Sequence, residues 1–317
     1  MTAPAGLLLL DVSSLQGAID YQAVAAWRSP DGRKIEGVIA RATNGTDPDS
    51  RFSANRAGAR AAGLRFGAYG VVYPGGDIEA EALAFCRVYS PAPDDLPPSC
   101  DWEVHGRCEH DAAVLWCSFV DTVTGRTSTI YTGIGYTSAV AWPKDSPLTK
   151  HPLWVAHYTN AAHPLVPSQW QGRFAEWQYS GDKGERVAGI ATDVDRDVFV
   201  EDTNGDGRVD AADIAAFVER SKRGEPVRVP PIDEVQRAIG VDADGVFGPK
   251  STAALRAWQS AHGVTPSGRL DLPTILAFAA HAPTEPPPPD TMRSEPDRAE
   301  SVTAPIQAAT LDACKGV

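Results

Sequence analysis

The segment LPPSCDWE, residues 96–103, carries two acids from which both the fold and the chemistry can be argued. Asp101 and Glu103 lie two positions apart, after a short stretch that is typical of a buried strand. Because alternate residues of a strand point to the same face, both carboxylates should face one cavity. Two acids so close cannot both ionise cheaply, so the pKa of one should rise. The alternative is a pair of acids on a solvated strand edge.

Such a pair suits the cleavage of a sugar bond. A carboxylic acid held protonated can protonate a glycosidic oxygen, while an ionised neighbour stabilises positive charge at the anomeric carbon. We therefore expect Glu103 and Asp101 to belong to the active site of a glycosidase.

The sequence around this segment alternates two patterns. Apolar runs typical of strands cover residues 6–12, 37–43, 64–73 and 127–132, and stretches with helical spacing cover 21–28, 53–62, 78–89 and 112–122. Residues 152–158, 174–180 and 191–200 then resemble strands without helices between them. The pattern predicts an α/β fold, an eight-stranded barrel with helical crossovers in its first part and an irregular last third. A small compact unit should follow it.

Polar and aromatic side chains cluster at the expected strand ends. Asp11, Tyr131, Tyr158 and Gln178 close strands, and Asp195 lies in the last one. Active sites of such barrels lie at the carboxyl ends of the strands, so these side chains should converge with Asp101 and Glu103.

Composition excludes several classes of protein. The 317 residues carry a net charge of −12, which argues against nucleic-acid binding. No stretch approaches the roughly 20 apolar residues of a membrane span. The five cysteines have no zinc-like spacing. A disulfide from Cys108 to Cys100 or Cys117 is one interpretation, and reduced buried thiols are the favoured one.

Several segments resemble the family 25 glycoside hydrolases, which are lysozymes. They are DVSSLQG (11–17), RATNG (41–45), GAY (67–69), DWE (101–103), IYT (130–132), PLWVAHY (152–158), WQY (177–179) and VDRDVF (194–199). Their order and spacing together are specific. The resemblance implies an irregular TIM-like barrel of five βα units followed by three strands. It also implies cleavage of the β-1,4 bond after N-acetylmuramic acid, without a cofactor for catalysis.

The resemblance also implies roles for residues. Glu103 matches the proton donor, and Asp101 the carboxylate that assists the 2-acetamido group of the substrate, which gives retention. Asp11 and Asp195 match acids that position the sugar. Candidate sugar-binding walls, with core packing as the alternative, are Tyr69, Tyr131, Trp154, Tyr158 and Trp177. Asn44 and Gly70 depart from the family's usual Glu and His, and groove shape could differ there.

The segment DTNGDGRVDAAD, residues 202–213, resembles a single calcium loop of the dockerin or EF-hand kind. Ligands would come from Asp202, Asn204, Asp206, the Arg208 carbonyl, Asp210 and Asp213. We expect a structural calcium ion, and a metal-free acidic turn is the alternative.

Residues 232–281 resemble the peptidoglycan-binding domain 1 family, through VQ (235–236), DGVFG (244–248), AWQ (257–259) and HG (262–263). We expect a catalytic barrel (1–201), a calcium-loop-like segment with a short helix (202–223), a linker (224–231), this three-helix domain (232–281) and a disordered Pro-rich tail (282–317).

The favoured function is an endolysin-type muramidase whose partner is bacterial peptidoglycan. We expect a monomer without membrane insertion, made in the host cytoplasm without a signal peptide and acting on the cell wall. A non-catalytic wall-binding or phage-tail protein is the alternative. A peptide-bond hydrolase would need a Cys/His pair or a zinc site, and the sequence supports neither.

Overall fold

The computed structural model describes residues 5–140, 143, 145–181, 186–203, 205–206 and 208–281. The expected ligand Asn204 and the expected disordered tail lie outside these residues. Eight strands close into a barrel, and the short β3 (Asp47–Pro48) pairs with β2 at its edge. The barrel strands are β1 (Leu7–Val12), β2 (Ile35–Asn44), β4 (Arg65–Val71), β5 (Ser99–Asp101), β6 (Thr129–Gly133), β7 (Leu153–Ala156), β8 (Glu176–Ser180) and β9 (Asp195–Phe199).

The barrel closes through β1, which pairs with β2 on one side and with β9 on the other. Neighbouring barrel strands from β1 to β8 pair in parallel, whereas β9 runs antiparallel to both β1 and β8 and the edge strand β3 antiparallel to β2. The predicted irregular α/β barrel is therefore confirmed, with a last strand whose direction the sequence did not reveal. Because β9 is reversed, its first residue lies at the carboxyl end of the other strands.

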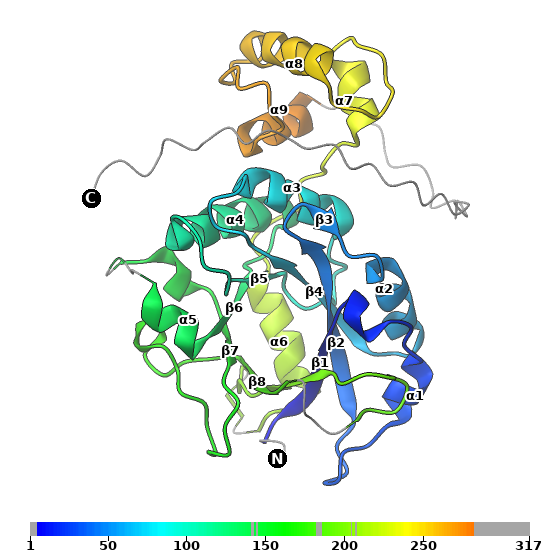
Figure 1. The fold of residues 1–317 in the computed structure, drawn as a ribbon, viewed down its shortest axis with the longest axis vertical. Helices are drawn as coiled ribbons and strands as arrows, with labels where there is room; N and C mark the ends of the chain where they lie inside the picture. Colours follow the sequence, from blue (N-terminus) through cyan, green and yellow to red (C-terminus); the bar gives the residue numbers. More distant parts are fainter. Residues whose placement is uncertain are drawn as a thin grey trace.

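Helices follow the first five parallel strands and cover the outside of the barrel (Figure 1). They are α1 (Tyr21–Ala26), α2 (Phe52–Ala61), α3 (Ile78–Val88), α4 (Glu109–Thr124) and α5 (Ile134–Ala139). After α5 only the 3-10 turns η2 (Pro147–Lys150) and η3 (Ser168–Trp170) separate the described parts of β6, β7 and β8. The five βα units agree with what the family resemblance implies, and the change of pattern after them agrees with the sequence.

The barrel has separate inner and outer apolar clusters. The inner one contains Leu9, Ile39, Tyr131, Trp154 and Phe199, and the outer one lies between strands and helices. α6 (Ala211–Ser221) adds Ile214, Phe217 and Val218 to the inner cluster and thereby closes the amino-terminal end of the barrel. The polar side chains of the barrel interior can therefore reach solvent only at the opposite end.

The carboxyl-terminal helices are α7 (Ile232–Ala238), α8 (Pro249–Ala261) and α9 (Leu272–His281). They contain an internal repeat. Gln236 and Gln259 each accept a backbone N–H from nine residues on, and each donates to a carbonyl ten residues on, at Val246 and Arg269 respectively. Each of two equivalent loops is thus held by hydrogen bonds to an equivalent glutamine side chain.

One of these loops contacts the barrel, and Figure 1 shows the three helices grouped beyond α3 and α4. Arg269 pairs with Asp77, the N-cap of α3, and lies 3.9 Å from Glu79. The backbone N–H of Leu272 also bonds to the Glu79 carboxylate. Because Asp77 follows β4, the contact lies at the same end of the barrel as Asp101.

Two other features complete the fold. Within the described residues, no helix has the length and apolar character needed to cross a bilayer. Cys86, Cys100 and Cys117 are buried free thiols, as favoured from the sequence. Cys108 is disulfide-bonded, contrary to that expectation, but neither Cys100 nor Cys117 is its partner.

Candidate active site

A cavity of about 90 Å³ lies at the carboxyl end of the barrel strands. All four predicted acids line it, together with three of the five predicted aromatic residues and one amide. The lining residues are Asp11, Tyr69, Asp101, Glu103, Tyr131, Trp154, Gln178 and Asp195.

Strand alternation places the DWE acids as predicted. Asp101 ends β5, and Glu103 lies two residues beyond the strand rather than on it. Trp102, between them, is fully buried on the opposite side and donates from Nε1 to the Glu109 carbonyl at 2.9 Å. That anchoring keeps both acids turned toward the cavity.

Asp195 reaches the same cavity by a different route. It begins the antiparallel strand β9 and is directly paired with Asp11 of β1. The sequence prediction that carboxyl ends of strands supply the acids is therefore corrected for this residue, which stands at an amino-terminal strand end.

Gln178 orders the polar side chains of the cavity. Its Nε2 donates to Asp11 Oδ2 at 2.7 Å. Its Oε1 accepts the hydroxyls of Tyr131 at 2.9 Å and Tyr158 at 2.5 Å. Because the carbonyl oxygen is occupied by two donors, the amide can only point its N–H toward Asp11.

Burial and mutual repulsion raise the pKa values of these acids. Burial is the largest cause for Asp11, whose pKa rises to about 8, with Asp195 adding repulsion and the Gln178 hydrogen bond opposing the rise. The pKa of Asp101 rises well above its usual range through burial and through repulsion from Glu103 and Asp11. Burial also raises the pKa of Glu103. The acids of the cavity therefore stay protonated at pH values above the usual pKa range of a carboxyl group.

Two further acids lie inside the barrel, and the sequence analysis missed both. Asp197 is fully buried on β9, and its Oδ1 accepts Trp154 Nε1 at 2.9 Å. Burial, and then repulsion from nearby Asp11, raise the pKa of Asp197 well above its usual range. Glu176, on β8, has its pKa raised to about 8 by burial. The acid-x-acid pattern at 195–197, equal to that at 101–103, was the available signal.

Of the five aromatic residues predicted to bind sugar, four lie in or beside the cavity and one does not. Tyr69, Tyr131 and Trp154 line the cavity, and Tyr158 is 55% exposed beside it, with its hydroxyl on Gln178. Trp177 does not line the cavity. It alternates with Gln178 on β8, belongs to the outer cluster and donates to the His157 carbonyl at 2.8 Å, so we assign it to packing.

The two departures from the family pattern have local explanations. Asn44 accepts the Tyr73 hydroxyl at 2.8 Å. At position 70 an added Cβ would lie 2.9 Å from Phe85 and 3.1 Å from Trp116, so these rings fill the space that a larger residue would need. Neither residue lines the cavity of the four acids.

The expected calcium loop does not gather its carboxylates into a cage. Asp202 Oδ1 accepts the N–H groups of Gly205 and Asp206, and Asp213 accepts those of Thr203 and Asp210. Over the described residues, which omit 204 and 207, no group of three or more acidic, histidine or cysteine side chains could hold a metal ion. As arranged here, the carboxylates serve the loop and the N-terminus of α6.

The sequence matches a known family of enzymes and a known binding domain. The sequence profile of glycosyl hydrolases family 25 matches residues 10–189. The chain belongs to this family. Residues 236–277 match the putative peptidoglycan binding domain. The family 25 chain is therefore a lysozyme, a muramidase that hydrolyses peptidoglycan and carries a peptidoglycan-binding domain.

Individual relatives agree. Lysozyme M1 of Streptomyces globisporus is 30% identical over 215 residues, 61% of this chain and 68% of that protein. The autolytic lysozyme of Clostridium acetobutylicum is 28% identical over 266 residues, 81% and 74% of the two chains. A bacterial lysozyme of Streptomyces coelicolor superimposes with a TM-score of 0.56 at 30% identity, covering 68% of this chain and 98% of the other.

Proposed function

We propose that Glu103 is the proton donor of the muramidase and that Asp101 assists the substrate's own acetamido group. The geometry in support is that both acids line one cavity with Asp11 and Asp195, opposite an outward-facing Trp102. Asp101 Oδ1 is buried and has no hydrogen-bond partner among the residues that the structure describes. It can therefore accept an N–H from the substrate.

The proposed reaction has two steps. The acetamido oxygen attacks the anomeric carbon while the glycosidic C–O bond breaks, and the leaving oxygen takes the proton from Glu103. Water then opens the cyclic intermediate, and the Glu103 carboxylate takes one of its protons. Two displacements at the same carbon give net retention. Asp11 and Asp195 position the sugar at the cavity.

A glycan whose muramic acid has lost its N-acetyl group tests this mechanism. If the acetamido oxygen is the nucleophile, the protein should cleave intact glycan but leave the N-deacetylated glycan uncut, as measured by mass spectrometry of released fragments. Cleavage of both at similar rates would contradict substrate assistance. A re-acetylated sample of the same glycan is the matched control.

We further propose an endolysin-type role, in which the protein is made in the host cytoplasm and reaches the wall once the membrane is opened. The pairing of a muramidase barrel with a peptidoglycan-binding module supports this role. Expression in a susceptible host with and without a membrane-permeabilising protein tests it. Lysis should need the permeabilising protein, and lysis without it would contradict the proposal.

We also propose, on the spacing of residues 202–213, that this segment binds one structural Ca²⁺. The ligands would be the six named above, and the carboxylates would have to turn from loop N–H groups toward the ion. Calorimetry with Ca²⁺, compared with an Asp206→Ala variant, measures binding directly. No heat of binding in the unaltered chain would contradict it.

A further inference from the structure

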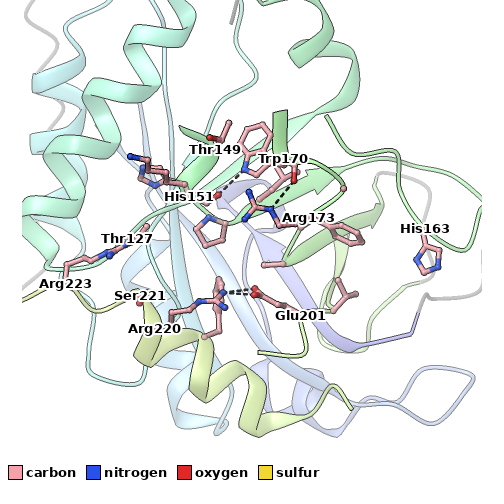
Figure 2. Close-up of a pocket in the computed structure, with 18 residues that line it drawn as sticks. Thr127, Thr149, His151, His163, Trp170, Arg173, Glu201, Arg220, Ser221 and Arg223 are labelled. Carbon is pink, nitrogen blue, oxygen red and sulfur yellow. Dashed lines mark hydrogen bonds and ion pairs between the residues drawn. The ribbon is translucent and has the colours of Figure 1, made fainter. Parts of the chain in front are cut away.

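A second cavity, of about 640 Å³, lies at the closed end of the barrel (Figure 2). Its walls come from the segment before β7, the loop before β8 and the end of α6. Leu153, Trp170 and Phe217 form an apolar floor, each almost fully buried. The four acids that line the active-site cavity are not among its lining residues, so it is a separate site.

The rim of this cavity is cationic in a chain whose net charge is −12. Lys150 comes from η2, Arg173 from the loop before β8, Arg220 from the last turn of α6, and Arg223 from just beyond that helix. Glu201 is the one acid among the lining residues, and Arg220 already pairs with it at 2.7 Å.

The remaining cations keep donors to spare. Arg173 uses Nε on the Trp170 carbonyl at 3.3 Å, and Arg223 uses Nε on the Thr127 hydroxyl. Over the described part of the chain, no acid forms an ion pair with Lys150, Arg173 or Arg223. The terminal guanidinium nitrogens of the two arginines are thus available to a ligand.

The negative end of the α6 dipole accounts for only part of this charge. A helix C-terminus favours nearby cations within its last turn, which covers Arg220, and Arg223 lies two residues beyond the helix. Asp121 attracts Arg223 from outside the cavity lining. Lys150 and Arg173 belong to other segments that face the same opening, and no described acid pairs with either, so an external anion can bind there.

We propose that this cavity binds a phosphate group of an anionic cell-wall glycopolymer. The proposal rests on the protein's action on bacterial walls and not on the assignment of Glu103. A tetrahedral phosphate offers oxygens on several sides, which suits cations that approach from three segments. A carboxylate has two oxygens in one plane and suits a single guanidinium. Concentrating positive charge on one face would also let an acidic protein approach an acidic wall.

Binding of purified poly(glycerol phosphate) tests the site, with poly-γ-glutamate as the carboxylate counterpart. The full chain should bind the phosphate polymer more tightly than the glutamate polymer, and more weakly as salt rises. The double variant Arg173→Gln/Arg223→Gln should weaken binding by about tenfold. Hydrolysis of a soluble peptidoglycan fragment should stay unchanged, which shows that the variant is folded.

A matched control removes the same charge at the same end of the barrel. Arg28→Gln/Lys34→Gln alters the exposed loop before β2 and should leave binding of the polymer unchanged. Equal weakening by both double variants would overturn the site. The phosphate assignment would be overturned if the unaltered chain bound neither polymer. It would also be overturned if the unaltered chain bound both polymers equally and Arg173→Gln/Arg223→Gln lost both.

Discussion

Gln178 donates its amide N–H to Asp11 Oδ2 at 2.7 Å, and this bond connects two strands that are not neighbours in the barrel. The two tyrosine hydroxyls on Gln178 Oε1 fix the amide's direction. The bond stabilises the ionised form of an acid whose pKa burial raises to about 8. Gln178 therefore limits the rise in the pKa of Asp11.

Replacing Gln178 with Leu should raise the pKa of Asp11 further. A hydrogen bond to a charged group contributes about 1.5–3 kcal/mol, so the shift should be about 1–2 pH units. The limb of the kcat/KM pH profile that reports Asp11 should move upward by that amount. Gln22→Leu, on the exposed face of α1, is the control. A profile unchanged in Gln178→Leu would show that Asp11 does not titrate with activity.

Glu176 should make the fold less stable as pH rises. Its folded pKa of about 8 exceeds the ordinary 4.5, so the folded state keeps a proton that the unfolded state has released. The free energy of unfolding therefore falls between pH 4.5 and about 8. Glu176→Gln should flatten this dependence and add about 1–2 kcal/mol at pH 8. Urea unfolding at the two pH values measures it, with exposed Glu219→Gln as control. An unchanged slope would refute the shift.

Arg269 should control how the peptidoglycan-binding module docks. Arg269 lies on the module and pairs with Asp77 and Glu79 at the start of α3. Asp271, also on the module, repels Glu79. Each surface pair contributes about 0–1 kcal/mol, so Arg269→Glu should lower the docked population about fivefold or more. Small-angle X-ray scattering should then report a larger radius of gyration.

Charge exchange separates docking from misfolding. Adding Asp77→Arg to Arg269→Glu should restore the compact form, while Arg237→Glu, which breaks a pair within α7, should leave docking intact. A radius of gyration that is equal in all four proteins would mean that Arg269 does not hold the module.

The sequence predicts most of the barrel because its strands are continuous apolar runs buried on both sides, such as 6–12 and 37–43. It does not predict α5, which has six residues and no side-chain cap. It also does not give the direction of β9, because side-chain alternation is the same in parallel and antiparallel strands.

The site is predicted in part for a similar reason. Asp101 and Glu103 share a face through a spacing of two, which the sequence displays directly. Asp197 points inward from the barrel wall, where only the closure of β1 on β9 identifies it as a neighbour of Asp11, and Glu176 lies near Asp197. Trp177 was a candidate because it is aromatic, but strand alternation turns Gln178 toward the cavity and Trp177 away from it.

Glu103 is the acid proposed to protonate the sugar bond. Glu103→Gln keeps the shape and removes the proton, so kcat on purified peptidoglycan should fall by about 10²–10⁴-fold with little change in the thermal midpoint of unfolding. Glu109→Gln, at the start of α4, should stay near the unaltered rate. Activity of Glu103→Gln close to that of the unaltered protein would contradict the assignment.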